Sequence, residues 1–418
     1  MSSINNKLPN GWVETTLGEI CKVGDGAHSK VERIEKGILY LTAKNFSNGN
    51  LKLDNVDYIS KVDYNRLFPI KSRAVTRVVE NDVLMGIIGS FGNAYRYKKG
   101  DEFGISSSVA ILRPKESVLY PVFLELYMNS VLFRKIHKTY SSGSVQGYSN
   151  IPTIKTMPII VPPLLEQKAI AKVLTAFDAK IENLQAQNKT LEQTAQTIFK
   201  EWFGLYQVGD VLPEGWRVGK LGVMVNLKSG YAFKSKDFVE ESSFKALKIK
   251  DLKGKGNVSI SDVSSVTEEC TKIERVQFFK LKAGDIVLAM SGNTTGKIGV
   301  VPPHKKEIYL NQRVGKFFLK DDKWNSFLYN FLMSGNYEEK ILAMGYGSAQ
   351  PNISPTQIEN IDIILPNSKK EQEYLAISNP IFDKVLVNNK QIQTLTKTRD
   401  TLLPKLMSGE LRVNEFKS

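Results

Sequence analysis

The sequence is poor in residues that build covalent or metal-held frameworks. It has two cysteines, Cys21 and Cys270, and three histidines, His28, His137 and His304, all far apart in the chain. Two isolated cysteines argue against a disulfide framework and a thiolate metal cage, and the histidines lack the paired spacing of metal ligands. We expect no metal site and a reducing compartment.

Long apolar runs are also missing. No stretch approaches the ~20 apolar residues that a membrane-spanning helix needs, and residues 1–12 contain no apolar signal segment. We therefore expect a cytoplasmic protein. With 418 residues, 42% of them hydrophobic, the chain is long enough for two or three globular units.

Two short motifs resemble parts of enzyme sites but lack essential residues. Residues 291–299 (SGNTTGKIG) imitate a phosphate-binding loop, yet the glycine spacing is too short and Ile298 replaces the magnesium-binding Ser or Thr. Residues 379–382 (NPIF) resemble an adenine methyltransferase motif without its second proline, and the chain has no glycine-rich cofactor loop. A nuclease-type cluster of carboxylates and lysine stays open, because spacing alone does not exclude it.

Positive charge is in excess, with a formal net charge of +14. Residues 1–160 and 206–366 hold most of this excess, whereas residues 161–205 are neutral. A basic balance favours a polyanionic partner such as nucleic acid, although many basic proteins bind none.

The chain contains an internal repeat. Residues 8–26 (LPNGWVETTLGEICKVGDG) match residues 212–230 (LPEGWRVGKLGVMVNLKSG), and residues 143–162 match residues 347–366. Two halves, each a globular domain followed by a helix, account for the whole sequence. Each globular stretch has short strand patterns with turn signals, together with helix patterns at 121–138 and near 324–335.

Residues 161–202 form the longest regular pattern, an apolar seven-residue repeat typical of a coiled coil. A helix of this length spans on the order of 60 Å. Its single asparagine at an a position is the usual device that fixes the register between two helices. The seam consists of Ile170, Leu174, Phe177, Ile181, Leu184, Asn188, Leu191, Ala195, Ile198 and Trp202.

Residues 369–408 are the expected partner helix, with a poorer seam. Pro380 and Pro404 are expected to kink or end it. The alternative is an ordinary amphipathic helix packed on the second globular domain. We favour an antiparallel pair, because the chain leaves the first helix, builds a domain and returns. The seam residues here include Val385, Ile392, Leu395, Leu402 and Leu406.

The predicted fold class is therefore α+β. Two similar mixed α/β domains, residues 1–160 and 206–366, which the resemblance described next identifies as target-recognition domains, are separated by a long antiparallel two-helix coiled coil with a pseudo-twofold repeat. The central spacer helix is residues 161–205, and the distal spacer helix is residues 367–418.

The chain resembles the specificity (S) subunit of type I DNA restriction–modification systems. The resemblance lies in the paired LPxGW openings, the paired GS-x-Q segments, the Pro-Pro-Leu-x-Glu-Gln segment at 162–167 and the LLxKLxSGEL ending at 402–411. It implies a non-catalytic subunit with two domains that each read half of a bipartite asymmetric site in double-stranded DNA. It also implies partners: two modification subunits that use S-adenosylmethionine, and restriction subunits that use ATP and magnesium. No cofactor is expected on this chain. A self-sufficient methyltransferase or nuclease, or a protein-only coiled-coil scaffold, remain the alternatives.

Candidate DNA contacts are loop residues that offer hydrogen-bonding groups beside Lys or Arg. Each set has a structural alternative: the GS-x-Q loops can serve folding, residues 92–100 can form a strand edge, and the lysine-rich loops can be ordinary solvated turns. The candidates are Lys30, Lys44, Asn45, Asn93, Tyr95, Arg96, Lys98, Ser144, Gln146, Lys228, Tyr231, Lys234, Lys250, Asn293, Lys297, Ser348 and Gln350.

Overall fold

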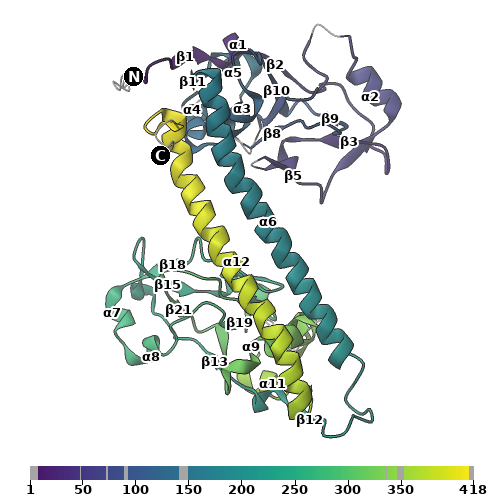
Figure 1. Ribbon diagram of the computed structural model, residues 1–418, viewed down its shortest axis with the longest axis vertical. Helices are drawn as coiled ribbons and strands as arrows, with labels where there is room; N and C mark the ends of the chain where they lie inside the picture. The colour runs from purple at the N-terminus through teal and green to yellow at the C-terminus, as the bar shows by residue number, and fades with distance from the viewer. Residues whose placement is uncertain are drawn as a thin grey trace. The chain divides into compact units, whose positions relative to one another are not determined.

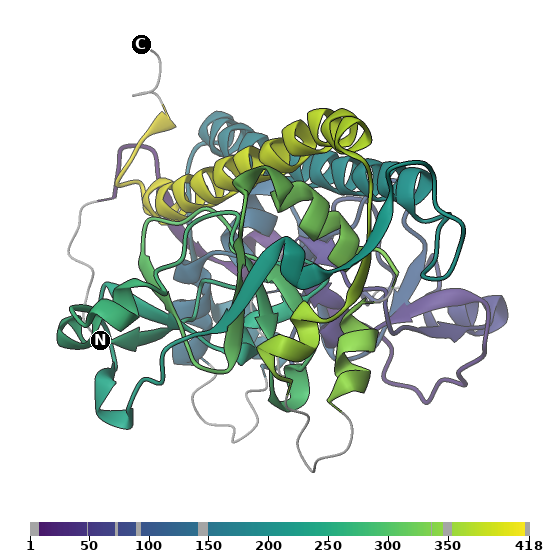
Figure 2. The same cartoon turned by 90° about the horizontal axis from the view of Figure 1, so that it is seen from below.

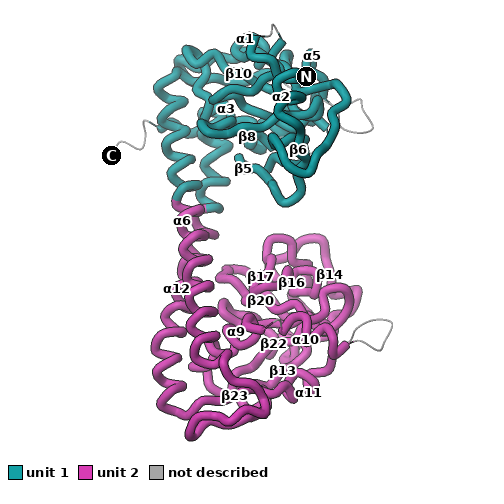
Figure 3. Tube along the Cα trace, turned by 90° about the vertical axis from the view of Figure 1, so that its right-hand side faces the viewer, with its two compact units in different colours: residues 1–179, 396–418 teal, residues 180–395 magenta. Residues whose placement is uncertain are grey.

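The computed structural model contains two similar sets of strands and helices, one in each half of the sequence (Figure 1). It describes residues 8–47, 49–71, 74–88, 93–140, 149–335, 337–345 and 353–413. The chain divides into two compact units, shown in two colours in Figure 3. Unit 1 comprises Met1–Ala179 and Thr396–Ser418, and unit 2 comprises Lys180–Leu395.

Unit 1 is built around a four-stranded sheet with strand order β2-β10-β7-β8. A second sheet has the order β6-β3-β9, and two-stranded pairs join β1 to β11 and β4 to β5. Its strands are β1 (Val13–Thr16), β2 (Cys21–Asp25), β3 (Ile38–Leu41), β4 (Phe46–Ser47), β5 (Asn50–Leu51), β6 (Asp57–Ile59), β7 (Val83–Gly86), β8 (Ala94–Arg96), β9 (Phe103–Ile105), β10 (Val109–Pro114) and β11 (Pro158–Val161). Its helices are α1 (Leu17–Ile20), η1 (Ala43–Asn45), α2 (Lys61–Leu67), α3 (Pro121–Met128), α4 (Val131–Tyr140) and α5 (Ile151–Thr156).

Unit 2 repeats this topology. Its central sheet has the order β13-β22-β19-β20, its second sheet β14-β18-β15-β21, and pairs join β12 to β23 and β16 to β17. Its strands are β12 (Arg217–Lys220), β13 (Val225–Ser229), β14 (Phe238–Val239), β15 (Phe244–Leu247), β16 (Leu252–Gly254), β17 (Asn257–Val258), β18 (Ser264–Val266), β19 (Ile286–Ala289), β20 (Ile298–Val300), β21 (Glu307–Leu310), β22 (Val314–Leu319) and β23 (Asp362–Leu365). Its helices are η2 (Leu221–Val223), η3 (Ser235–Asp237), η4 (Ile249–Asp251), α7 (Glu268–Thr271), α8 (Glu274–Gln277), η5 (Gly292–Thr294), η6 (Asp322–Trp324), α9 (Asn325–Met333), α10 (Tyr337–Met344) and α11 (Pro355–Glu359).

The central sheet of each unit is buried on both faces. In β7, Val83 and Met85 belong to the core formed with α3 and α4, whereas Leu84 belongs to the core shared with the β6-β3-β9 sheet. In β19, Ile286 and Val287 divide between two cores in the same way. Such strands have near-continuous apolar sequences because successive side chains point to opposite, equally buried faces.

One repeated glycine has a clear structural reason. A Cβ at Gly26 would clash with the carbonyl oxygen of Ile105, and a Cβ at Gly230 would clash with that of Leu310. The loop after β2, like the loop after β13, can approach the neighbouring backbone this closely only because glycine has no side chain.

The prediction of two similar mixed α/β domains is confirmed.

Two long helices, α6 (Leu164–Phe203) and α12 (Ser368–Ser408), contribute segments to both units. In unit 1, Arg399 Nη1 donates to Asp178 Oδ1 at 2.7 Å. In unit 2, Lys370 Nζ lies 3.6 Å from the centroid of the Trp202 ring, and α9 packs on α12 (Figure 2). In unit 1, Glu166 near the start of α6 bonds to Arg412 just after α12, and in unit 2, Asn188 bonds to Asn388. Residue numbers therefore rise along α6 as they fall along α12, so the two helices run antiparallel within each unit.

Two local predictions are wrong, one of them only in part. The single helix expected at 121–138 is broken into α3 and α4, because the Asn129 side chain bonds to the backbone of Ala94 and the Ser130 hydroxyl accepts from the Phe133 amide at 3.1 Å. Such side-chain bonds to the backbone favour a helix end. Neither Pro380 nor Pro404 ends α12, which continues from Ser368 to Ser408, so the predicted helix end is wrong, whereas a kink stays a prediction.

Candidate nucleic-acid interface

In unit 1, three loops are joined to the turn of residues 106–108, between β9 and β10. The first two amides of this turn donate to the carbonyls of Leu41 at 2.9 Å and Ala27 at 3.0 Å. Its last carbonyl accepts from the Ile87 amide at 2.9 Å. The loop after β2, the η1 turn after β3 and the loop after β7 therefore meet at one place, which we name the loop end of unit 1.

Unit 2 has the same arrangement around the turn of residues 311–313. Its amides donate to the carbonyls of Leu247 at 3.0 Å and Tyr231 at 2.9 Å, and its last carbonyl accepts from the Met290 amide at 3.0 Å. The loop after β13, the η4 turn and the loop after β19 meet here and form the loop end of unit 2. Both halves thus present four segments in one frame.

The loop end of unit 1 exposes cations that the sequence predicted. Lys30 lies in the loop after β2 and Lys44 in η1; both are exposed, and neither forms an ion pair with a residue that the structure describes. Asn93 is half-buried and directly precedes β8, where the loop after β7 returns. Exposed lysines without acidic partners are suited to contact phosphates.

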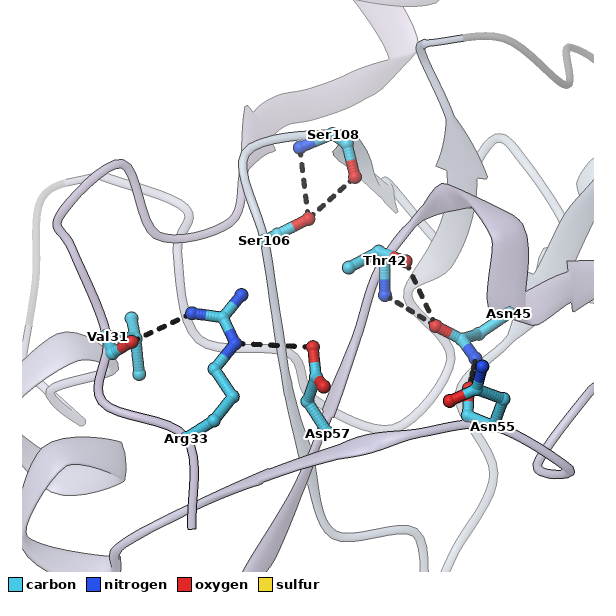
Figure 4. Close-up of polar contacts among 8 residues, drawn as sticks. All are labelled: Val31, Arg33, Thr42, Asn45, Asn55, Asp57, Ser106 and Ser108. Carbon is cyan, nitrogen blue, oxygen red and sulfur yellow. Dashed lines mark hydrogen bonds and ion pairs between the residues drawn. The ribbon is translucent and has the colours of Figure 1, made fainter.

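Asn45 is turned into the protein (Figure 4) and is 3% exposed. Its Oδ1 accepts from the amide and hydroxyl of Thr42 at 2.9 and 3.1 Å, and its Nδ2 donates to the carbonyls of Lys52 and Asn55 at 3.0 and 3.1 Å. Both donors and both acceptor positions of the amide are occupied. The corresponding Asp251 accepts the matching backbone N–H in η4 at 2.9 Å. Asn45 therefore shapes the turn, and its predicted base contact is not supported.

Figure 4 also shows three polar contacts that the sequence did not single out. Arg33 Nε donates to Asp57 Oδ2 at 3.2 Å, and its Nη1 donates to the Val31 carbonyl at 2.8 Å. The hydroxyls of Ser106 and Ser108 lie 2.6 Å apart. These contacts stabilise the loop after β2 and the turn of residues 106–108, which are parts of the loop end in unit 1.

The loop end of unit 2 carries four of the predicted residues. Lys234, Lys250 and Asn293 are exposed, and Tyr231 is half-buried with its ring edge-on to Phe233 at 5.1 Å. The neighbouring η4 and η5 turns carry Lys250 and Asn293 respectively. A cation and an amide therefore lie on adjacent turns, as a DNA-contacting surface requires.

Sequence reasoning missed Arg313. This exposed side chain ends the turn of residues 311–313 and forms no ion pair with any described residue. The corresponding residue of unit 1 is Ser108, so the two units present different groups from the same backbone position. The available signal was a polar NQR triplet directly before the apolar strand of residues 314–319.

The predicted contacts Tyr95, Arg96 and Lys98 lie away from the loop end, toward the start of β7. Tyr95 is buried, and its hydroxyl donates to Asp101 Oδ2 at 2.8 Å; burial and Asp101 raise the pKa of the phenol. Arg96 forms an ion pair with Glu125 at 3.6 Å, and Lys98 Nζ lies 5.2 Å from the centroid of the Tyr95 ring. This favours the alternative of a structural strand edge.

Two further candidates border the loop end of unit 2. Lys228 Nζ lies 5.0 Å from the centroid of Phe278, an exposed ring that stacks on Phe318 at 4.9 Å. Lys297 directly precedes β20 and is half-buried, with its aliphatic side-chain atoms beside Gly254.

Four of the predicted DNA contacts lie outside the described residues: Ser144, Gln146, Ser348 and Gln350.

The predicted seam residues differ in how deeply they are buried. Ile170, Leu174, Ile181, Leu184, Asn188, Ala195 and Leu406 are buried, whereas Phe177, Leu191, Ile198, Trp202, Val385, Ile392, Leu395 and Leu402 are half-buried.

The buried ionisable groups of the described residues have structural partners or low reactivity. Lys316 Nζ donates to Asp285 Oδ2 at 2.6 Å, and Arg113 bonds to Asp82 at 2.8 Å at the corresponding place in unit 1. Burial raises the pKa of the Cys21 thiol to about 12, which keeps it protonated.

Among the described residues, no group of three or more His, Cys, Asp and Glu side chains is placed to hold a metal ion. No helix in the described part of the chain has the length and apolar content needed to cross a membrane.

Comparisons with known proteins agree with the repeat. The family model of the type I restriction modification DNA specificity domain matches residues 9–193 and again residues 213–397. The chain is 27% identical to the type I restriction enzyme MjaVIII specificity subunit of Methanocaldococcus jannaschii, over 98% of this chain and 95% of that protein. It is 21% identical to the EcoKI specificity subunit of Escherichia coli, over 97% and 90% of the two chains. Its fold is similar to the crystal structure of a type I S subunit from M. genitalium, with a TM-score of 0.58, 18% identity and 97% coverage of both chains.

Proposed function

Because two matches of one family model cover most of its length, this chain belongs to the type I restriction–modification DNA specificity family, and we propose that each unit reads one half of a bipartite, asymmetric site. The chain is the non-catalytic specificity subunit, and its role is DNA recognition. The target-recognition domains are residues 1–160 and 206–366, each with its loop end toward the DNA.

One observation carries this proposal: the two loop ends share a backbone frame but differ in the groups they present. The position of Ser108 in unit 1 is taken by Arg313 in unit 2; the Ser108 hydroxyl hydrogen-bonds within its own unit, while the Arg313 guanidinium bonds to no residue that the structure describes. A shared frame would dock on the duplex in the same way, because phosphate contacts fix position. Different side chains on that frame would read different bases.

The exposed lysines of the loop ends provide the phosphate contacts in this proposal. Lys30 and Lys44 serve unit 1, and Lys234 and Lys250 serve unit 2. Each such contact releases counterions from the duplex, so binding should weaken steeply as salt rises.

The spacer helices, residues 161–205 and 367–418, form an antiparallel coiled coil that fixes the gap between half-sites and docks two modification subunits. The antiparallel pairing of α6 with α12 inside each unit supports this, as do the asparagines that join them in unit 2. S-adenosylmethionine would bind the modification subunits, and ATP with Mg²⁺ would bind restriction subunits that join the complex. Such a complex acts on chromosomal DNA, which places it in the cytoplasm.

The test is to express the chain with its modification subunits in cells without other adenine methylation, and then to map methylated adenines. We expect marks at one bipartite motif, and none when the chain is omitted. Methylation that does not depend on this chain, or that lacks a bipartite motif, would refute the proposal. The purified chain alone should neither methylate nor cut DNA.

A further inference from the structure

The turn between β19 and β20 contains two hydroxyl groups that have no hydrogen-bond partner among the described residues. Ser291 Oγ and Thr294 Oγ1 are both buried, and no residue that the structure describes accepts from or donates to either. Buried polar atoms almost always have a partner, because an unpaired one loses its bonds to water without replacement. A pair of them in one turn therefore needs an explanation.

The turn does not depend on these hydroxyls for its shape. The adjacent Thr295 Oγ1 donates to the Gly292 carbonyl at 2.6 Å, and the Gly296 amide donates to the Ala289 carbonyl at 2.9 Å. These bonds close the turn on both sides. Ser291 and Thr294 could be replaced by apolar residues of similar size without loss of any bond in the turn.

The tip of the turn is Asn293, which is exposed and whose amide bonds to no other described residue. Ile249 of η4 packs against Gly292, which places the exposed Lys250 on the adjoining turn. On the other side, the Met290 amide donates to the Arg313 carbonyl at 3.0 Å. The segment that carries Asn293 therefore adjoins two segments that carry exposed cations, Lys250 and Arg313, and neither cation forms an ion pair with a described residue.

We propose that residues 291–294 are the base-reading segment of unit 2, an inference that rests on the proposed function. Asn293 pairs through its amide with a base edge in the major groove, for which adenine N6 and N7 are the matching groups. Ser291 and Thr294 gain hydrogen bonds to the target when the turn adjusts on the DNA. Lys250 and Arg313 contact the flanking phosphates. This gives a role to a motif whose glycine spacing excludes nucleotide binding.

The first experiment compares Thr294→Val with the matched control Thr295→Val in the complex with modification subunits. Melting temperature is measured, together with affinity for the mapped target and for DNA with the unit 2 half-site scrambled. Thr294→Val should leave the melting temperature unchanged or higher and weaken target binding about tenfold, with scrambled DNA unaffected. Thr295→Val should lower the melting temperature by about 2–4 °C, because it removes a bond that closes the turn.

Two results would overturn the inference. One is a Thr294→Val variant that melts as early as Thr295→Val and binds its target normally, because the hydroxyl would then be structural. The other is an equal loss of affinity for target and scrambled DNA, because the turn would then contact only the backbone.

The second experiment maps methylation with Asn293→Ala and Asn293→Asp. Both should relax or change one base position in the half-site of unit 2 and leave the other half-site intact. Unchanged specificity, or relaxation in the other half-site, would contradict the inference. The wild-type complex separates this test from the proposed function: if wild type does not prefer a bipartite site, the function fails, whereas a specific wild type with unaffected variants removes only the reading role of this turn.

Discussion

Asn388 Nδ2 donates to Asn188 Oδ1 at 2.8 Å, so two buried asparagines join α12 to α6 within unit 2. Asn188 Nδ2 in turn donates to Asn389 Oδ1 at 2.8 Å. A buried polar contact of this kind is satisfied in only one alignment of the two helices, which is how a single asparagine sets register.

Replacing Asn388 by Leu should lower the free energy of unfolding by about 1–3 kcal/mol, because Asn188 Oδ1 then stays buried without its donor. Replacing both Asn188 and Asn388 by Leu should recover most of that loss, since neither asparagine is then left buried without its partner, and Asn389 Oδ1, which loses the Asn188 donor, is half-buried and can bond to water. Urea unfolding measures both values. A double variant that loses the sum of two single losses would contradict this account.

Removing the guanidinium of Arg113 should be more costly than removing that of Arg66. The Arg113→Met variant leaves the fully buried Asp82 carboxylate without its ion-pair partner, which should cost about 3–5 kcal/mol. The matched control Arg66→Met breaks an exposed pair with Asp63 and should cost less than about 1 kcal/mol. Equal losses in the two variants would show that Asp82 is not held by Arg113.

His137 should make the protein less stable in mild acid. Burial lowers the pKa of its imidazole below the ordinary value of 6.5, so the unfolded chain binds a proton that the folded chain does not. The free energy of unfolding should therefore fall as pH drops below about 6.5, by at most about 1.4 kcal/mol per pH unit. Denaturation at pH 5, 6 and 7 should show a smaller fall for His137→Gln; the same fall in both proteins would exclude His137 as the cause.

The loop-end lysines should contribute to the salt dependence of DNA binding. Lys44→Ala should reduce the slope of log affinity against log salt by about 0.9, the value for one phosphate contact. Lys98→Ala is the matched control, because Lys98 lies near the start of β7 and packs over the Tyr95 ring. A larger change of the salt slope for Lys98→Ala than for Lys44→Ala would indicate that the DNA contacts lie at the other end of β8.

The helix pair should act as a ruler. Seven residues inserted beside both Asn188 and Asn388 keep the seven-residue repeat and lengthen each helix by about 10 Å. Because successive base pairs are about 3.4 Å apart, the gap between half-sites should grow by about three base pairs. Methylation mapping reads the gap directly, and an unchanged gap would exclude the ruler.

The sequence predicted the repeat and the long helices well because these depend on pattern alone. Identical residues in the two halves have the same role, as Gly26 and Gly230 do where the chain passes against backbone. The apolar period of residues 161–202 marked α6 to within a few residues. Local side-chain bonds were harder to foresee, and they explain why Ser130 begins a new helix and why Asn45 closes a turn.

The candidate site was predicted only in part, because loops far apart in the sequence build it. Alternating Tyr and Arg in residues 92–100 has the same appearance whether one face or both faces of a strand are buried, and Tyr95 proved to be core. Arg313 lies at the loop end of unit 2 because the Met290 amide donates a hydrogen bond to its carbonyl, and no local sequence pattern reveals that pairing.

The most direct test of separate readers is methylation mapping with a chimera. Residues 206–366 are replaced by the corresponding part of a related chain with a different target, and the chimera is expressed with the same modification subunits. The account predicts a new bipartite motif in which one half-site is changed and the other is retained. A motif altered in both halves would contradict it.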